Sequence, residues 1–148
     1  MVEDRIEQEV SIKAPLSRVW ELVTEPGWWV PTDTVGPFDR TPGSRTVRQT
    51  QKWGCYVVEV VQIEPQTYAA FRWAPQDEAE ELAEGKATLV EFHVGPVGEA
   101  VSVTVVETGF ASLDSDEEGR EAAFREHTEG WQDELGELKA RAEEVPAA

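Results

Sequence analysis

The chain has 148 residues, the length of one ordinary domain, and 40% of them are hydrophobic and 29% charged, as in globular proteins. Its 30 acidic residues against 13 basic ones give a charge of -17, which opposes binding to nucleic acid and to anionic membranes. No apolar run approaches the roughly 18 residues of a membrane span, and the acidic start (Glu3, Asp4) does not resemble an export signal. We therefore expect a single domain over 1–148 in the cytoplasm.

Residues that commonly hold metals or cofactors are scarce. The single cysteine, Cys55, cannot form an intrachain disulfide, and with only His93 and His127 beside it a structural zinc site of usual spacing cannot form. No base or cation near Cys55 in the sequence would activate it, so we expect an inert thiol. Glycine-rich phosphate loops and nucleophile motifs are missing as well. The sequence therefore predicts neither a metal nor a cofactor.

The chain begins with a predicted strand and a short helix. Residues 6–13 alternate apolar and polar side chains, which indicates a strand with one buried face. Pro15 suits the first turn of a helix, and apolar residues at helical spacing continue until Pro26-Gly27. Residues 28–43 contain too many prolines and glycines for a long element, so we expect a loop with at most one more helical turn.

Five further strands are predicted from β-branched and aromatic enrichment between turn residues. They cover 44–51, 54–63, 67–73, 88–94 and 101–108. The acidic stretch 77–84 separates the first three from the last two, which should form a hairpin connected through Gly95, Pro96 and Gly98. Links this short permit only antiparallel neighbours.

The last segment is predicted to be a long amphipathic helix. Ser115 and Glu118 have the spacing of a capping box, and apolar residues from Phe124 to Ala142 recur every three or four positions. The helix should end near Glu144. The element order predicts an α+β fold in which a curved antiparallel sheet of about six strands wraps around this helix, with one or two short helices after the first strand.

Large aromatic side chains gather near the predicted loops, where a sheet curved around a helix would be open. They could line a pocket or simply fill the space. Filling is favoured energetically, because a dry cavity of about 300 Å³ costs about 7 kcal/mol. The candidate ligand-binding residues are Trp29, Trp53, Tyr56, Phe71, Trp73, Phe92, Glu107, Phe110, Phe124, His127 and Trp131.

Glu107 and His127 are the two polar candidates. The strand alternation that turns Val103 and Val105 inward also turns Glu107 inward, unless the strand ends before it and Glu107 meets solvent. A buried carboxylate would have a raised pKa or a partner such as His127 or an arginine. His127 lies one helical turn before Trp131, so it could reach the pocket or only bond a nearby carbonyl.

Several short motifs, in this order, resemble those of the SRPBCC or START-like superfamily, which has the helix-grip fold of the birch pollen allergen. They are Ala14-Pro15, Val19-Trp20, Pro42-Gly43, Ile63-Glu64-Pro65, Phe71-Arg72-Trp73, Thr88-Leu89-Val90-Glu91-Phe92, Thr108-Gly109-Phe110, His127, Gly130-Trp131, Leu135 and Leu138. The chain is most similar to the branch named for activators of the ninety-kilodalton heat-shock chaperone ATPase. The resemblance implies a cavity between sheet and helix that holds a hydrophobic molecule.

Three functions remain open from the sequence. The leading hypothesis is binding of a small hydrophobic or aromatic molecule, such as a lipid or polyketide, by a monomer or homodimer. The alternative is an enzyme of the polyketide cyclase, aromatase or dehydratase type, in which Glu107 and His127 act as acid and base. The third is a chaperone-associated or other protein-interaction module. Activation of a chaperone ATPase is not expected, because eukaryotic co-chaperones place a separate domain before this one.

Overall fold

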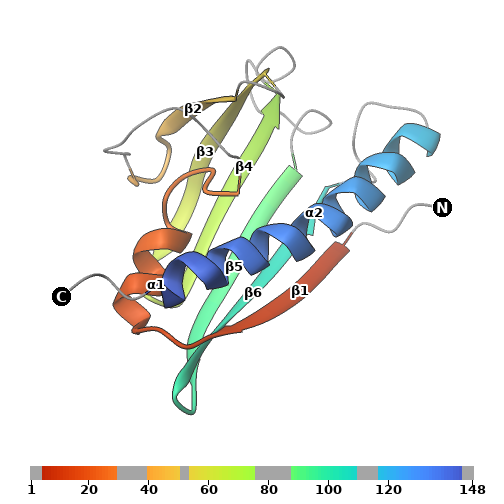
Figure 1. Ribbon diagram of the computed structural model, residues 1–148. Helices are drawn as coiled ribbons and strands as arrows, with labels where there is room; N and C mark the ends of the chain where they lie inside the picture. The colour runs from red at the N-terminus through yellow and green to blue at the C-terminus, as the bar shows by residue number, and fades with distance from the viewer. Residues whose placement is uncertain (1–4, 30–39, 51–53, 76–87, 110–116, 145–148) are drawn as a thin grey trace.

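A computed structural model describes residues 5–29, 40–50, 54–75, 88–109 and 117–144 (Figure 1). The described elements are, in chain order, β1 (Arg5–Ile12), α1 (Leu16–Val23), β2 (Arg45–Thr50), β3 (Gly54–Glu64), β4 (Tyr68–Pro75), β5 (Thr88–Val97), β6 (Ala100–Thr108) and α2 (Glu117–Glu143). They agree with the predicted ranges except at a few ends. Ser115 of the expected capping box lies outside the described residues.

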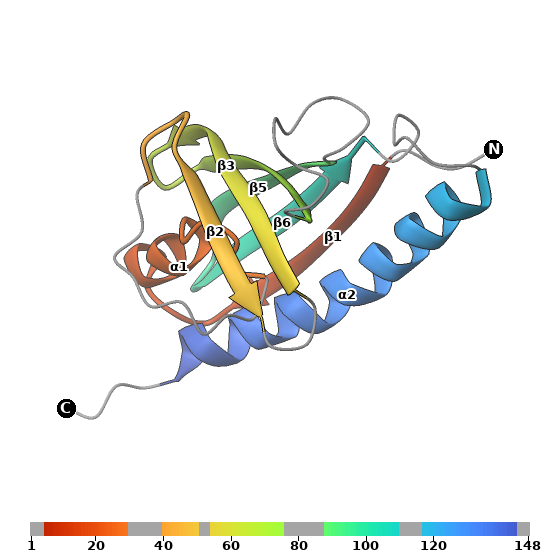
Figure 2. The ribbon, with the colours of Figure 1, turned by 90° about the horizontal axis from the view of Figure 1, so that it is seen from above.

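The strands form one antiparallel sheet in the order β1-β6-β5-β4-β3-β2, so the first strand pairs with the last. A bulge between Val60 and Gln62 in β3 shifts the pairing with β4 and adds local twist. Figures 1 and 2 show the sheet curving around α2, with α1 beside the C-terminal end of that helix. The predicted α+β helix-grip fold is confirmed.

Alternating side chains explain why α2 packs on one face of the sheet. In β5 and β6 every second residue is buried, including Val90, Phe92, Val103 and Val105, as the sequence predicts. The buried stripe of α2 consists of Trp131, Leu135, Leu138 and Ala142. Removing these two apolar faces from water provides most of the driving force for the fold.

Polar contacts hold both halves of α2 against the rest of the chain. Gln8 of β1 donates a hydrogen bond from Nε2 to the Thr128 carbonyl oxygen at 2.8 Å. The Arg18 side chain of α1 donates from Nε to the Ala142 carbonyl oxygen at 3.0 Å. Carbonyls in the last helical turn lack partners within the helix, so the Arg18 guanidinium both satisfies one and complements the helix dipole.

The turn between β5 and β6 differs from the sequence prediction. The predicted connection began at Gly95, but β5 continues through Gly95 and Pro96 to Val97, which pairs with Ala100. Between Gly95 and Ala100, Gly98 is the residue with a positive φ, of 61°, so the reversal occurs there. Gly95 and Pro96 are compatible with extended backbone, and the pairing with β6 holds them in it.

In the described part of the chain, no helix has the length and apolar character needed to cross a membrane.

Candidate functional site

Glu107 lies on the inner face of β6 near the end of that strand. Its side chain is 0% exposed, and its strand neighbours are Ile6 on β1 and Val90 on β5. The predicted inward orientation is therefore confirmed. A carboxylate in such apolar surroundings is costly unless hydrogen bonds compensate for the water it has lost.

Four side chains donate hydrogen bonds to Glu107 and so replace the water that it has lost. We call Glu107 and these four residues the Glu107 network: Trp73, Thr88, His127 and Trp131. Trp131 Nε1 donates to Oε1 at 2.8 Å, and Trp73 Nε1 donates to Oε2 at 3.0 Å. The Thr88 hydroxyl donates to Oε2 at 2.5 Å. His127 Nδ1 lies 2.9 Å from Oε1 and 3.0 Å from Oε2, and it must donate because an ionised carboxylate only accepts. Because the donors come from β4, β5 and α2, the network joins the helix to the sheet.

The network favours an ionised pair. Burial alone would raise the pKa of Glu107, but hydrogen bonds from His127, Thr88 and Trp131 together with the His127 charge hold it below its usual range. Burial would lower the pKa of His127, but its hydrogen bond to Glu107 and the charges of Glu107 and Glu126 raise it. The His127 side chain is still 27% exposed, so this partly accessible imidazole is bonded to a carboxylate that solvent does not reach.

The raised pKa of His127 predicts that the pair loses its stabilising effect in alkaline solution. This effect is fully present below the ordinary histidine pKa of 6.5 and is lost as the pH rises through the higher pKa of the folded state. At low pH it is lost again, as the pH falls through the lowered pKa of Glu107. Urea unfolding from pH 6 to 9 should therefore show that stability decreases more steeply in the wild type than in His127→Gln.

The matched control for that measurement is His93→Gln, which removes the other histidine. His93 is exposed and points to the opposite side of β5 from Val90 and Phe92. Its variant should keep the wild-type slope, which for one proton can reach about 1.4 kcal/mol per pH unit. Equal slopes for wild type and His127→Gln would contradict a raised pKa at His127.

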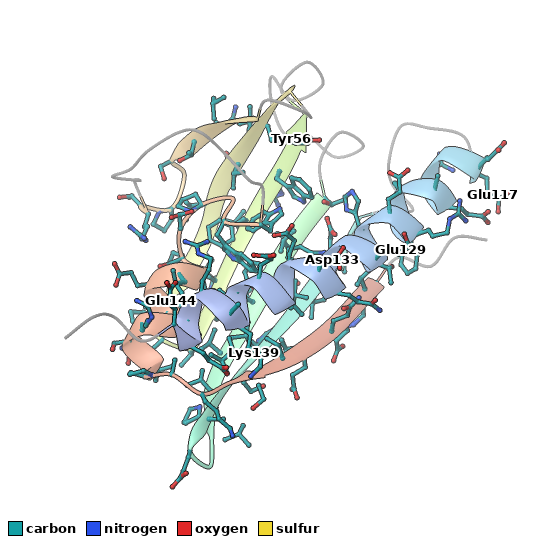
Figure 3. All side chains as sticks on the ribbon, viewed as in Figure 1. Tyr56, Glu117, Glu129, Asp133, Lys139 and Glu144 are labelled. Carbon is teal, nitrogen blue, oxygen red and sulfur yellow. The ribbon has the colours of Figure 1, made fainter. Side chains whose placement is uncertain are left out.

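Three partly exposed rings form a row, and we call them the aromatic wall: Trp73 and His127, which belong to the Glu107 network, and Tyr56, which lies beside Trp73. The ring centroids of Tyr56 and Trp73 are 5.5 Å apart, and those of Trp73 and His127 are 5.3 Å apart. Figure 3 labels Tyr56, which lies near the start of β3. The wall joins β3, β4 and α2 and places flat rings next to a polar cluster.

The other described aromatic candidates lie deeper. Trp29, Phe71, Phe92 and Trp131 are at most 5% exposed and belong to one buried cluster. The ring centroid of Trp29 lies 5.6 Å from that of Phe71, 5.6 Å from that of Phe92 and 5.7 Å from that of Trp131. Phe124 is partly buried and packs against this core. These rings fill space between sheet and helix; the candidates Trp53 and Phe110 lie outside the described residues.

Sequence reasoning paired Glu107 with His127 but missed Thr88 and the two indole N–H groups as its hydrogen-bond donors. Thr88 could have been found, because alternation places it on the same face of β5 as Val90, which pairs with Glu107. The indole donors could not, because the direction of a tryptophan N–H depends on how the ring packs in three dimensions.

A curved antiparallel sheet that grips a long helix, with a short helix after the first strand, is the arrangement of the helix-grip class of START-like proteins. Within this class, the chain belongs to the family described as Activator of Hsp90 ATPase homolog 1-like protein, whose model matches residues 13–143. A comparison with curated protein sequences found no significant match.

Several solved structures share this fold. Protein MLL2253 from Mesorhizobium loti is 16% identical with a TM-score of 0.74, over 97% of this chain and 99% of that one. The Aha1 dimer from Colwellia psychrerythraea is 15% identical with a TM-score of 0.71, over 98% and 100%. DynU16, from the dynemicin biosynthetic locus, is 25% identical with a TM-score of 0.63, over 93% of this chain and 46% of that one.

Proposed function

We propose that the protein binds a small hydrophobic or aromatic molecule against the aromatic wall. The observation that carries this proposal is that two partly exposed rings, Trp73 and His127, bond to a fully buried carboxylate, with the Tyr56 ring next to Trp73. Flat rings offer a stacking surface, while the imidazole of His127 adds polarity at one end. The family fits ligand binding in general, and the ligand class is our inference.

The wall is a better place for a ligand than the deep interior. Phe71 and Phe92 are 0% exposed and Trp29 is 5% exposed, so a ligand there would have to displace packed rings. Each such ring buries roughly 150–250 Å² of surface, and displacing one would cost several kcal/mol. A ligand that contacts the exposed part of Trp73 has fewer packed contacts to displace, because this ring is only partly buried.

The test is a fluorescence titration with 2-naphthol, a flat apolar molecule with one hydroxyl group. We expect saturable binding that Trp73→Ala weakens by roughly two- to tenfold, since stacking on one ring contributes roughly 0.5–1.5 kcal/mol. The control is Tyr68→Ala, which removes a ring from the opposite face of β4 and should leave affinity unchanged. Equal affinity for all three proteins would contradict binding at the wall.

Native mass spectrometry of protein purified from its own host addresses the natural ligand. A retained mass that Trp73→Ala loses and Tyr68→Ala keeps would support a carrier. An unliganded protein that also fails to bind 2-naphthol would contradict the proposal.

Catalysis is the second candidate, favoured by the 2.9 Å bond between His127 and Glu107. A histidine held by a buried carboxylate has the geometry of a general acid or base and its orienting partner. Because Glu107 already accepts from four side chains, His127 would transfer the proton and Glu107 would orient it. A loss of turnover in His127→Ala that clearly exceeds the loss of ligand affinity would favour an enzyme.

If the protein instead acts by binding another protein, that binding should persist when the rings of the aromatic wall are replaced.

We propose a monomer or a homodimer, the latter because a similar protein from Colwellia psychrerythraea was solved as a dimer. Sedimentation velocity distinguishes the two.

A further inference from the structure

The carboxylate of Glu107 has no remaining capacity to accept a hydrogen bond from a ligand. An ionised carboxylate has about four lone-pair sites. Oε1 accepts from Trp131 and His127, and Oε2 accepts from Trp73 and Thr88. The Glu107 side chain is also 0% exposed, so a ligand cannot reach it from solvent. A hydrogen-bond donor on a ligand therefore finds no partner in this carboxylate.

His127 supplies the positive charge of the Glu107 network. The other three donors are neutral, because two are indole N–H groups and one is a hydroxyl. A buried carboxylate is stable only with a closely placed counter-charge, and His127 Nδ1 lies 2.9 Å from one oxygen and 3.0 Å from the other. Burial opposes a charge on His127, but the bond to Glu107 and the charges of Glu107 and Glu126 outweigh it and raise the pKa. Below that pKa both ring nitrogens carry a proton.

The second ring nitrogen of His127, Nε2, is directed away from Glu107. The two nitrogens of an imidazole point to different sides of the ring, and the bond from Nδ1 fixes which side faces the carboxylate. The His127 side chain is 27% exposed, whereas that of Glu107 is 0% exposed. His127 is therefore the member of the ion pair that a ligand can reach.

The His127 end of the aromatic wall thus combines a flat surface with a charged donor. The Trp73 ring centroid is 5.3 Å from that of His127, and the Trp73 N–H already donates to Glu107. An aromatic ring that rests on Trp73 would have its substituent close to the imidazolium. An imidazolium only donates, so the matching substituent is one that accepts.

We propose that the ligand of the aromatic wall is an aromatic compound with a hydrogen-bond-accepting oxygen, either a carbonyl or a carboxylate, which accepts from His127 Nε2 while the ring lies on Trp73. This inference rests on the proposed function, which requires only that a flat apolar molecule binds at the wall. It adds the polarity of the ligand. The overall charge of -17 favours cations over anions, so a preference for acceptor oxygens would have to come from a local donor.

The test is an NMR titration at pH 6 and about 0.15 M salt with three ligands that share a naphthalene ring. They are 2-acetylnaphthalene, a neutral acceptor, 2-naphthoate, an anionic acceptor, and 2-naphthylmethylamine, a cation that only donates. We expect both oxygen ligands to bind about tenfold more tightly than the amine, because hydrogen bonds from charged donors are strong. Whichever oxygen ligand binds more tightly identifies the acceptor as a carbonyl or a carboxylate.

His127→Gln should reduce this preference to less than about twofold, because it removes the charged donor. The matched control is His93→Gln, which removes the exposed histidine on the opposite side of β5 and should keep the tenfold preference. A pH series on the wild type needs no variant. As the pH rises through the pKa of His127, which faces Glu107 of β6 and is influenced by Glu126 of α2, Nε2 changes from donor to acceptor and the preference should disappear.

Two different failures can be distinguished. Equal affinity of the wild type for all three ligands, weakened by Trp73→Ala, would keep the proposed function and overturn the inference about the acceptor oxygen. The same holds if His127→Gln and His93→Gln retain the preference equally. Absence of binding for all three ligands and for 2-naphthol would contradict both the proposed function and this inference.

Discussion

Glu107→Gln should lower the free energy of unfolding by about 3–5 kcal/mol, the usual cost of breaking a buried ion pair. Glutamine keeps the volume of glutamate, so the loss would not come from packing. Its amide has one acceptor oxygen and one NH₂ group, whereas Trp73, Thr88, His127 and Trp131 all direct donors at this position. The NH₂ group would face donors, and the His127 charge would lose its partner. Urea unfolding at pH 6, where that charge is present, is the measurement.

Glu91→Gln is the matched control for this experiment. Glu91 lies on the outer side of β5 and accepts a single hydrogen bond, from the Tyr68 hydroxyl at 2.5 Å. Glutamine keeps one oxygen that can accept from this hydroxyl, so the variant should cost at most about 1 kcal/mol. A cost below about 1 kcal/mol for Glu107→Gln, or equal costs for both variants, would refute the view that the network joins α2 to the sheet.

Periodic patterns made the fold predictable. In β5 and β6 the residues expected to face inward are buried, and in α2 the apolar stripe from Trp131 to Ala142 packs inward. These patterns are local, because a side chain's face follows from its position along the strand or helix. The prediction failed at Gly95 and Pro96, where the residue types favour a turn but pairing with β6 keeps the backbone extended.

The candidate site was only partly predictable, because alternation assigns a face but not a depth. Trp29 and Trp73 were both expected near an opening, yet Trp29 is 5% exposed while Trp73 remains partly exposed beside Tyr56 and His127. Which ring fills space and which meets solvent is decided by contacts between distant segments.

Phe92→Ala should cost about 3–5 kcal/mol, the range for removing a large buried ring. Phe92 is 0% exposed, and its ring contacts those of Trp28, Trp29, Phe71 and Trp131. Four such neighbours cannot all move into the vacated space, so a cavity should remain. Apolar cavities of this kind stay dry and take up small apolar molecules, so saturating benzene should restore part of the lost stability. Urea unfolding with and without benzene measures both effects.

Phe92→Leu is the control, because it keeps most of the volume and should cost clearly less than the alanine variant. The comparison also decides where a hydrophobic ligand can bind. If Phe92→Ala costs less than about 1 kcal/mol, the interior already has free space around this ring, and the ligand site would belong there. A cost of about 3–5 kcal/mol means that Trp29, Phe71 and Phe92 pack closely, so a ligand is restricted to the partly exposed rings of Tyr56, Trp73 and His127.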